Sequence, residues 1–105
     1  MVEITGHPVY SCKNCRNIVA LRDDIISKDF VAKSGKGYMF ARGMNMAIGA
    51  KEDKQLISGY FSIAPIFCTK CDEEMGWTYI KAYDAPQKYK EGKYVFETVK
   101  LLKEY

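Results

Sequence analysis

Short apolar runs that alternate with polar positions dominate this chain, and glycine and turn-forming residues separate them. The clearest runs are Val9–Ser11, Tyr38–Met46, Tyr60–Phe67, Trp77–Ala82 and Tyr94–Val99, all rich in aromatic and β-branched side chains. Such runs predict β-strands, and the scattered glycines favour strands and turns over long helices. We therefore expect a mostly β, antiparallel fold with few or short helices.

Several positions within the runs predict local departures from regular strands. Gly43 indicates an irregularity, such as a bulge, within Tyr38–Met46, and Pro65 places its strand near an edge or a bend. The segment Ile18–Ser27 predicts a strand with a turn at its two aspartates, or one helical turn. The tail Val99–Tyr105 predicts an extension of the last strand or a short helix.

All four cysteines of the chain fall into two Cys-x-x-Cys pairs, Cys12/Cys15 and Cys68/Cys71, and 52 residues separate the pairs. A two-residue gap lets both sulfurs of a pair point at one ion, and four thiolates complete a tetrahedral site. Zinc is the expected occupant, and the strands are expected to meet at it. Iron in the same cage and a redox dithiol are the alternatives that the spacing leaves open.

A site closed by four sulfurs predicts a structural metal rather than a catalytic one, since a catalytic zinc keeps a position for water. The single histidine, His7, lies in a Gly-His-Pro turn with no nucleophile nearby, so we expect no enzymatic activity. In a chain of 105 residues the core is modest. Structural zinc contributes roughly 10–16 kcal/mol of apparent binding free energy, so the metal-free chain is expected to be unfolded or molten. Three basic residues in or beside the pairs, Lys13, Arg16 and Lys70, are expected to offset the charge of the thiolates.

Charge and hydropathy limit the compartment and the partners. Sixteen basic and thirteen acidic residues are interleaved, for a formal net charge of +3, so a nucleic-acid partner is disfavoured. The first eleven residues lack a basic start followed by an apolar run, and no stretch approaches the roughly 18 apolar residues of a membrane span. We expect no signal peptide, no membrane association and a reducing compartment in which thiols stay available to metal.

Aromatic residues after the second cysteine pair form the second candidate site. Trp77 and Tyr79 are two residues apart, so both face the same side of a strand, either in the core or on a platform for a small ligand or peptide. The basic stretch Gln87–Lys93 predicts a solvated loop. A weaker hypothesis, nucleic-acid binding, would rest on four lysines: Lys81, Lys88, Lys90 and Lys93.

The two cysteine pairs and the sequence segments around them resemble the Yippee-like family, and the plant-type members in particular. The resembling segments cover the chain from Tyr10 to Glu97: YSCKNCRNIVALRDDIISKDF, GKGYMF, N-x-x-x-G, LISGYFSI, CTKCDEEMGW and QKYKEGKYVFE. The spacing C-x2-C-x52-C-x2-C is the family's own.

This resemblance implies an N-terminal extension over residues 1–9 and a single Yippee domain over residues 10–105. The implied fold is the β-tent of the Mis18 proteins and the thalidomide-binding domain of cereblon, in which two antiparallel sheets meet near one structural zinc ion bound by four cysteines. It further implies a non-enzymatic protein-interaction adaptor in the nucleus and cytoplasm, with partners in ubiquitin-ligase or cell-division assemblies. The sequence does not predict the oligomeric state.

The resemblance also supplies an alternative function, a receptor for a small ligand or peptide. Cereblon holds its ligand in a cage of three tryptophans and a phenylalanine. Here Trp77 matches one cage tryptophan, Tyr79 stands where the phenylalanine would be, and Ile57 and Ile63 lie near the other walls. The related methionine sulfoxide reductases need a cysteine beyond the four on zinc, and this chain has none. That activity is therefore expected to be absent.

Overall fold

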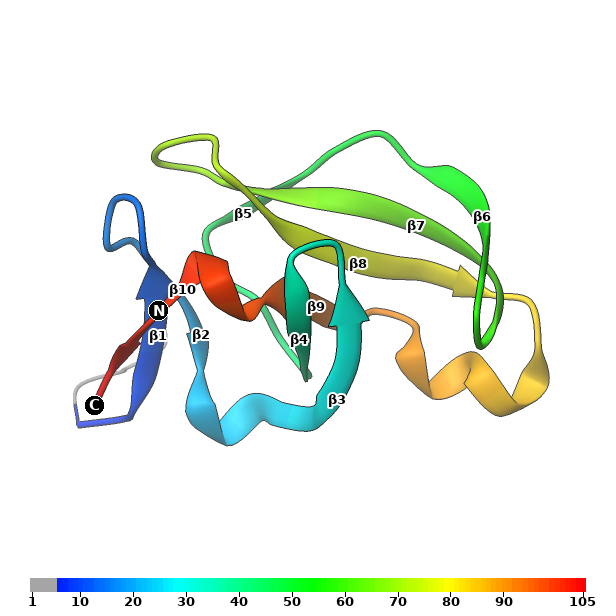
Figure 1. The fold of residues 1–105 in the computed structure, drawn as a ribbon, viewed down its shortest axis with the longest axis horizontal. Coiled ribbons are helices and arrows are strands. Elements are labelled where there is room, and N and C mark those ends of the chain that lie inside the picture. The colour runs from blue at the N-terminus through cyan, green and yellow to red at the C-terminus, as the bar shows by residue number, and fades with distance from the viewer. Residues whose placement is uncertain (1–5) are drawn as a thin grey trace.

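The structure, a computed structural model, describes residues 6–105 and consists of β-strands joined by turns and short 3-10 helices (Figure 1). The strands are β1 (Val9–Cys12), β2 (Ile18–Leu21), β3 (Ile25–Ala32), β4 (Gly35–Phe40), β5 (Met46–Ile48), β6 (Glu52–Leu56), β7 (Gly59–Cys68), β8 (Glu74–Ala82), β9 (Tyr94–Glu97) and β10 (Leu101–Glu104). The 3-10 helices are η1 (Arg22–Asp24), η2 (Ala85–Lys90) and η3 (Thr98–Lys100). The prediction of a mostly β fold with few or short helices is confirmed.

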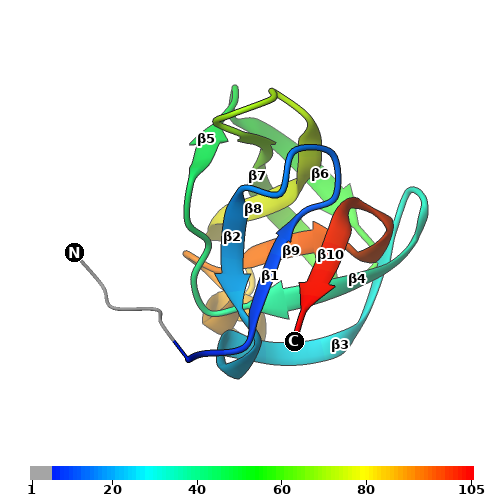
Figure 2. The same ribbon diagram turned by 90° about the vertical axis from the view of Figure 1, so that its left-hand side faces the viewer.

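The smaller sheet joins the two ends of the described chain. Its strand order is β10-β1-β2, and Val9 of β1 lies opposite Glu104 of β10 and Leu21 of β2. Figure 2 shows these three strands side by side, facing the viewer. The predicted strand before the first cysteine pair is therefore the central strand of this sheet.

The larger sheet has seven strands in the order β3-β4-β9-β8-β7-β5, with β6 also pairing with β7. All of its pairings are antiparallel. Its longest strands, β7 and β8, pair with each other from Phe61 opposite Ala82 to Phe67 opposite Glu74. These are the predicted runs around the second cysteine pair.

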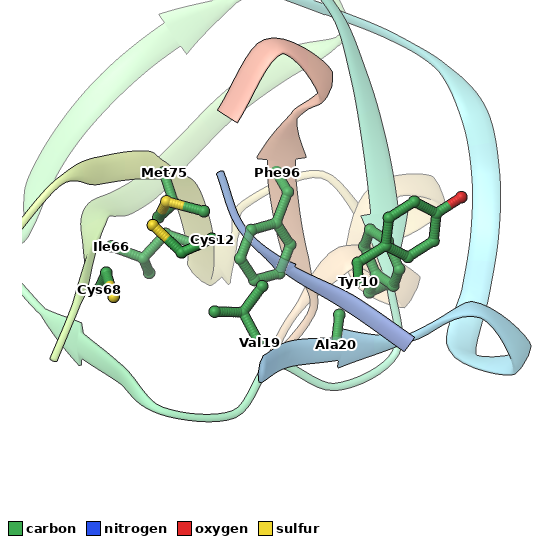
Figure 3. Close-up of a cluster of buried hydrophobic side chains, with 9 residues drawn as sticks. Tyr10, Cys12, Val19, Ala20, Ile66, Cys68, Met75 and Phe96 are labelled. Atoms are coloured by element: carbon green, nitrogen blue, oxygen red, sulfur yellow. The ribbon is translucent and has the colours of Figure 1, made fainter. Parts of the chain in front are cut away.

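Two core clusters cover the two faces of the larger sheet, as the alternation of its side chains requires. Phe40 and Phe96 belong to the first cluster, which also contains Tyr10 and Val19 from the smaller sheet. Figure 3 shows that this cluster continues to Cys12 and Cys68. The neighbouring residues Met39 and Val95 belong to the second cluster, on the opposite face, together with Phe61 and Tyr79.

The chain passes from one sheet to the other at two 3-10 helices. After β2 of the smaller sheet, η1 turns the chain into β3 of the larger sheet, and after β9 of the larger sheet, η3 turns it into β10 of the smaller one. The predicted turn at Asp23–Asp24 is thus a helical turn between two strands. The tail forms a short helix and then a strand, but that strand does not extend β9.

One local prediction is wrong, and one alternative of a second is wrong. Gly43 is not a bulge in a continuous strand, because β4 ends at Phe40 and β5 begins at Met46. A Cβ at Gly43 would lie 2.9 Å from Cδ2 of Tyr94, so glycine permits a close approach to that ring. Of the two alternatives for Pro65, the edge is wrong, because β7 pairs with β8 on one side and with β5 and β6 on the other. The bend stays open, since the register of β7 with β8 shifts at Ser62/Ile63 and at Ile66/Phe67. The carbonyl of Pro65 accepts a hydrogen bond from the Gly49 backbone amide at 2.8 Å, in the gap between β5 and β6.

The strand β6, with the sequence EDKQL, was not predicted from the sequence. Its charged and mostly exposed residues show no apolar alternation. The domain boundary between residues 9 and 10 stays a prediction, since residues 1–5 of the expected extension lie outside the described residues. Within residues 6–105, no helix has the length and apolar character needed to cross a membrane.

Candidate metal centre

The first cysteine pair lies in a tight turn directly after β1. The backbone amide of Cys12 donates to the carbonyl of Asn17 at 2.7 Å, and the amide of Arg16 donates to the carbonyl of Cys12, also at 2.7 Å. Arg16 adopts a positive φ of 66°, which reverses the chain immediately after Cys15. This geometry explains why the two-residue gap turns both sulfurs toward the same point.

The second cysteine pair repeats this turn at the end of β7. The amide of Cys68 donates to the carbonyl of Glu73 at 2.9 Å, and the amide of Asp72 donates to the carbonyl of Cys68 at 2.8 Å. Asp72, directly after Cys71, has a positive φ of 63°. The two turns therefore have the same backbone hydrogen bonds at equivalent positions, one from each sheet.

The four sulfurs form one cluster between the sheets. Sγ of Cys12 lies 3.7 Å from Sγ of Cys71, Sγ of Cys15 lies 3.5 Å from Sγ of Cys68, and all four sulfurs lie within 4.8 Å of one another. Four sulfurs bound at 2.3 Å around a tetrahedral ion would be separated by about 3.8 Å. The separations exceed the bond length of about 2.05 Å in a disulfide, so the cysteines are free thiols placed to bind one metal ion.

Two asparagines that the sequence analysis missed hold this cluster in place. Nδ2 of Asn17 donates to Sγ of Cys68 at 3.4 Å, from one turn to a ligand of the other. Nδ2 of Asn45 donates to the carbonyl of Ile18 at 2.6 Å, and the carbonyl of Asn45 accepts from the amide of Thr69 at 3.0 Å. Such contacts orient metal ligands. Both asparagines lie in segments that carry the family resemblance, but neither was assigned a role there, since their partners are distant along the chain.

The thiols of the cluster differ in their tendency to ionise. Burial opposes ionisation of Cys68, but hydrogen bonds from the Asn17 side chain and from the amides of Lys70 and Cys71 outweigh it and lower the pKa of Cys68 to about 6. Burial raises the pKa of Cys12. The amide of Asn17 favours the Cys15 thiolate, but burial and the neighbouring thiols outweigh it and raise the pKa of Cys15 to about 12. Four neighbouring thiolates therefore need a cation among them.

The basic residues expected to offset the thiolate charge do not act as a group. Lys13 and Lys70 are exposed, whereas the Arg16 guanidinium forms an ion pair with Glu104 at 2.7 Å. That ion pair ties the first cysteine turn to β10. His7 lies in an exposed turn, as expected.

A cavity of about 790 Å³ lies on the face of the larger sheet that carries the second core cluster. Residues of β3 and β6, at opposite ends of the sheet, both line it, so the sheet curves around the space. We call this space the sheet cavity. All four residues of the second candidate site, Trp77, Tyr79, Ile57 and Ile63, line it.

These four residues differ in exposure. The rings of Trp77 and Tyr79 meet edge to face with 6.3 Å between their centroids and 73° between their planes. Tyr79 is buried and Trp77 is partly exposed. Ile57 is fully exposed in the turn between β6 and β7, and Ile63 is half-buried. Trp77 and Tyr79 therefore face the same side of β8, as predicted, while ligand binding by the four residues stays a prediction.

Lys90 is a residue of the sheet cavity that the sequence analysis placed wrongly. The expected solvated loop contains the 3-10 helix η2, and Lys90 at its end is only 4% exposed. Its Nζ lies 2.9 Å from Oγ of Ser58, and burial lowers its pKa. Lys90 is thus unavailable for the nucleic-acid contact considered for four lysines, and Lys88 of the same set pairs with Glu91 at 3.5 Å.

Comparison with known sequences finds one family over almost the entire described chain. A sequence profile of the Yippee-Mis18 family, described as "Yippee zinc-binding/DNA-binding /Mis18, centromere assembly", matches residues 8–104. Protein yippee-like At4g27745 of Arabidopsis thaliana is 48% identical over 104 residues, which cover 99% of this chain and 98% of the relative. Protein yippee-like 4 of Rattus norvegicus is 41% identical over 98 residues, which cover 93% of this chain and 77% of the relative.

A solved structure has the same fold. The crystal structure of the Mis18 "Yippee-like" domain matches with a TM-score of 0.73, and the match covers 94% of this chain and 96% of that domain. The sequence identity is 17%, so this likeness concerns the fold alone. The prediction of two antiparallel sheets that meet near a four-cysteine site is confirmed.

Proposed function

The chain belongs to the Yippee-Mis18 family, and from this premise we propose that it is a non-enzymatic, zinc-stabilised adaptor that binds protein partners. The cluster of four cysteines between the two sheets carries the proposal. A zinc ion bound there would cross-link β1 of one sheet to β7 of the other and would have no open position for a substrate. The metal would thus supply stability, and the surface of the domain would supply the function.

The donor set supports zinc as the metal. Four thiolates at tetrahedral separations suit zinc and iron alike, and the family description names zinc. Metal analysis of protein purified without added metal tests this assignment, with one zinc per chain expected. Iron in place of zinc would contradict it.

The partners that we propose are subunits of ubiquitin-ligase or cell-division assemblies in the nucleus and cytoplasm. The family description mentions centromere assembly, which supports a role in cell division. The same description mentions DNA binding. A nucleic-acid partner nevertheless stays disfavoured, because Lys90 of the four candidate lysines is buried and Lys88 is ion-paired.

Affinity purification tests the adaptor proposal. The tagged chain is compared with Ile57→Asp, at the exposed β6–β7 turn, and with Val99→Asp, a control at another exposed apolar position. We expect reproducible partners with the unmodified chain and with the control, and their loss with Ile57→Asp if they bind at the sheet cavity. A tagged chain that recovers no reproducible partner would contradict the proposal.

The sheet cavity favours a second function, a receptor for a small ligand or a peptide segment. Its volume of about 790 Å³ falls within the range of ligand pockets, and aromatic and aliphatic side chains line it. Trp77 is the single tryptophan of the chain, so its fluorescence reports directly on the cavity. A fragment library in which no compound changes this fluorescence would argue against a receptor.

A further inference from the structure

Lys90 stands out among the charged residues of the described chain because its side chain is almost completely removed from water. Only Lys90 and Glu97 are buried among the charged side chains of residues 6–105, and Lys90 is 4% exposed. Transfer of an ammonium group out of water is costly unless an anion or several acceptors surround it. The surroundings of Lys90 therefore decide how well its charge is matched.

Aromatic rings rather than carboxylates surround the Lys90 ammonium. Its Nζ lies near the centroids of four rings: Phe61 at 5.0 Å, Phe30 at 5.2 Å, Tyr79 at 5.5 Å and Tyr89 at 5.9 Å. Its polar partner is Oγ of Ser58 at 2.9 Å. Among residues 6–105, no carboxylate lies within 4.0 Å of this nitrogen. An ammonium has three donors, so the rings and one hydroxyl leave both its charge and its donors incompletely matched.

A second buried donor belongs to the same cavity. The indole Nε1 of Trp77 is buried and forms no hydrogen bond of ordinary geometry, although the Tyr79 hydroxyl lies within its reach. Both Trp77 and Lys90 line the sheet cavity. The cavity therefore offers a buried cation and a weakly matched indole donor, together with the apolar side chains of Ile63 and Phe30.

We propose that the sheet cavity binds ligands in which a carboxylate is attached to an apolar group. The carboxylate accepts hydrogen bonds from the Lys90 ammonium, and the apolar group packs against Trp77 and Ile63. This inference rests on the receptor function proposed above and names its ligand class. A free organic acid and the C-terminus of a peptide both present this chemistry.

The remaining charges of the sheet cavity are compatible with an anion at Lys90. Asp29, Glu52 and Glu74 also line the cavity, but they are exposed, so solvent screens them. The buried Glu97 already accepts a hydrogen bond from Ser34 and lies in β9 beyond Phe96, which is opposite Gly76. Gly76 is three residues, or roughly 10 Å, along β8 from Tyr79, and Glu97 lies one residue farther from the Lys90 end of the cavity.

A cationic ligand is excluded by the same arrangement. Four rings around an ammonium are the arrangement that binds methylated lysine or choline. Here the chain's own Lys90 already fills this position, and its charge would repel a second cation. Tetramethylammonium is therefore a negative control that distinguishes the carboxylate site from a cation receptor.

Titration of Trp77 fluorescence with matched acids and amides tests the inference. The first pair of probes is phenylacetate and phenylacetamide, and the second is N-acetyl-glycyl-phenylalanine and its C-terminal amide. We expect each acid to bind roughly 10- to 100-fold more tightly than its amide, since a hydrogen bond to a charged group is worth more than a neutral one. Comparison of the two acids then distinguishes a free organic acid from a chain terminus.

Two lysine variants on the same helix localise the effect. Lys90→Met keeps the length of the side chain and removes its charge, so the acid–amide difference should disappear while the amides still bind. Lys88→Met, at an exposed position of η2, should retain the full difference. If Lys90→Met fails to fold, as judged by its thermal midpoint, the unmodified chain with the acid and amide pairs still decides the question.

The possible results separate this inference from the receptor function itself. Equal affinity for acid and amide in the unmodified chain would overturn the carboxylate inference and leave the receptor intact. Tighter binding of tetramethylammonium than of phenylacetate would overturn it in favour of a cation receptor. A failure of all probes to change Trp77 fluorescence would count against both.

Discussion

The hydrogen bond from Asn17 to Cys68 allows a direct test of how the cysteine cluster is organised. Nδ2 of Asn17 lies 3.4 Å from Sγ of Cys68, across the boundary between the two cysteine turns. Replacement of Asn17 by leucine removes the donor, keeps the approximate shape of the side chain, and leaves unchanged the backbone carbonyl that accepts from Cys12. The variant therefore isolates one contact to one metal ligand.

The expected loss follows from the charge on the sulfur. A hydrogen bond to a charged group contributes about 1.5–3 kcal/mol, and each 1.4 kcal/mol is a factor of ten, so metal affinity should fall roughly 10- to 100-fold. Removal of a residue that hydrogen-bonds to a metal ligand typically lowers metal affinity by a factor of this size. The pKa of Cys68, now lowered to about 6, should also rise, because the lost donor favoured the thiolate. Metal uptake should then need a higher pH.

Competition with a chelating dye measures the affinity at neutral pH and again across a pH series. Asn14→Leu is the matched control, since Asn14 belongs to the same turn and has an exposed side chain. We expect the control to retain the original affinity. An Asn17→Leu variant that binds metal as tightly as the unmodified chain, or a control that loses as much, would refute the argument.

Three further predictions concern the metal, a glycine and catalysis. Chelation of the metal should abolish the cooperative thermal transition, because an ion bound by the four cysteines would join the two sheets; an unchanged thermal midpoint by circular dichroism would show that the cluster is not a clamp. Gly76→Ala should destabilise the fold by about 3–5 kcal/mol in chemical denaturation, because φ is +153° and a Cβ would lie 1.9 Å from the carbonyl oxygen of Val95. Gly92→Ala, at φ +77° with nothing within 4 Å, should cost about 1–2 kcal/mol, and equal losses in the two variants would contradict this account. Purified protein should not reduce methionine sulfoxide, since all four cysteines belong to the metal cluster, and measurable turnover would disprove this.

Local features of the chain were predictable because the information about them is local. The two-residue gap within each cysteine pair selects the turn that directs both sulfurs to one point, and the structure repeats that turn at Cys12 and Cys68. Alternation of apolar and polar residues is also local along the chain, and it predicted the strands β7, β8 and β9. The place of Trp77 and Tyr79 on one side of β8 followed from the period of a strand.

The environment of Lys90 was not predictable, because its neighbours are far away in the sequence. Phe30 comes from β3, Phe61 from β7 and Tyr79 from β8, and only the curvature of the sheet brings them around one nitrogen. A basic segment with tyrosines is usually solvated, so composition alone favoured the wrong environment. The same reason explains why Asn17 went unnoticed, since its partner sulfur belongs to the other half of the chain.

Period and spacing act over a few residues, so the sequence alone was enough to predict antiparallel strands and two cysteine turns whose sulfurs converge on one point. The folded molecule adds which sheet each strand joins, with the crossings at η1 and η3, and how the larger sheet curves into a cavity around Trp77 and Lys90. Backbone hydrogen bonds are chemically the same in every strand and do not select a partner. The choice depends on how side chains from distant segments pack together, and that packing exists only in the folded molecule.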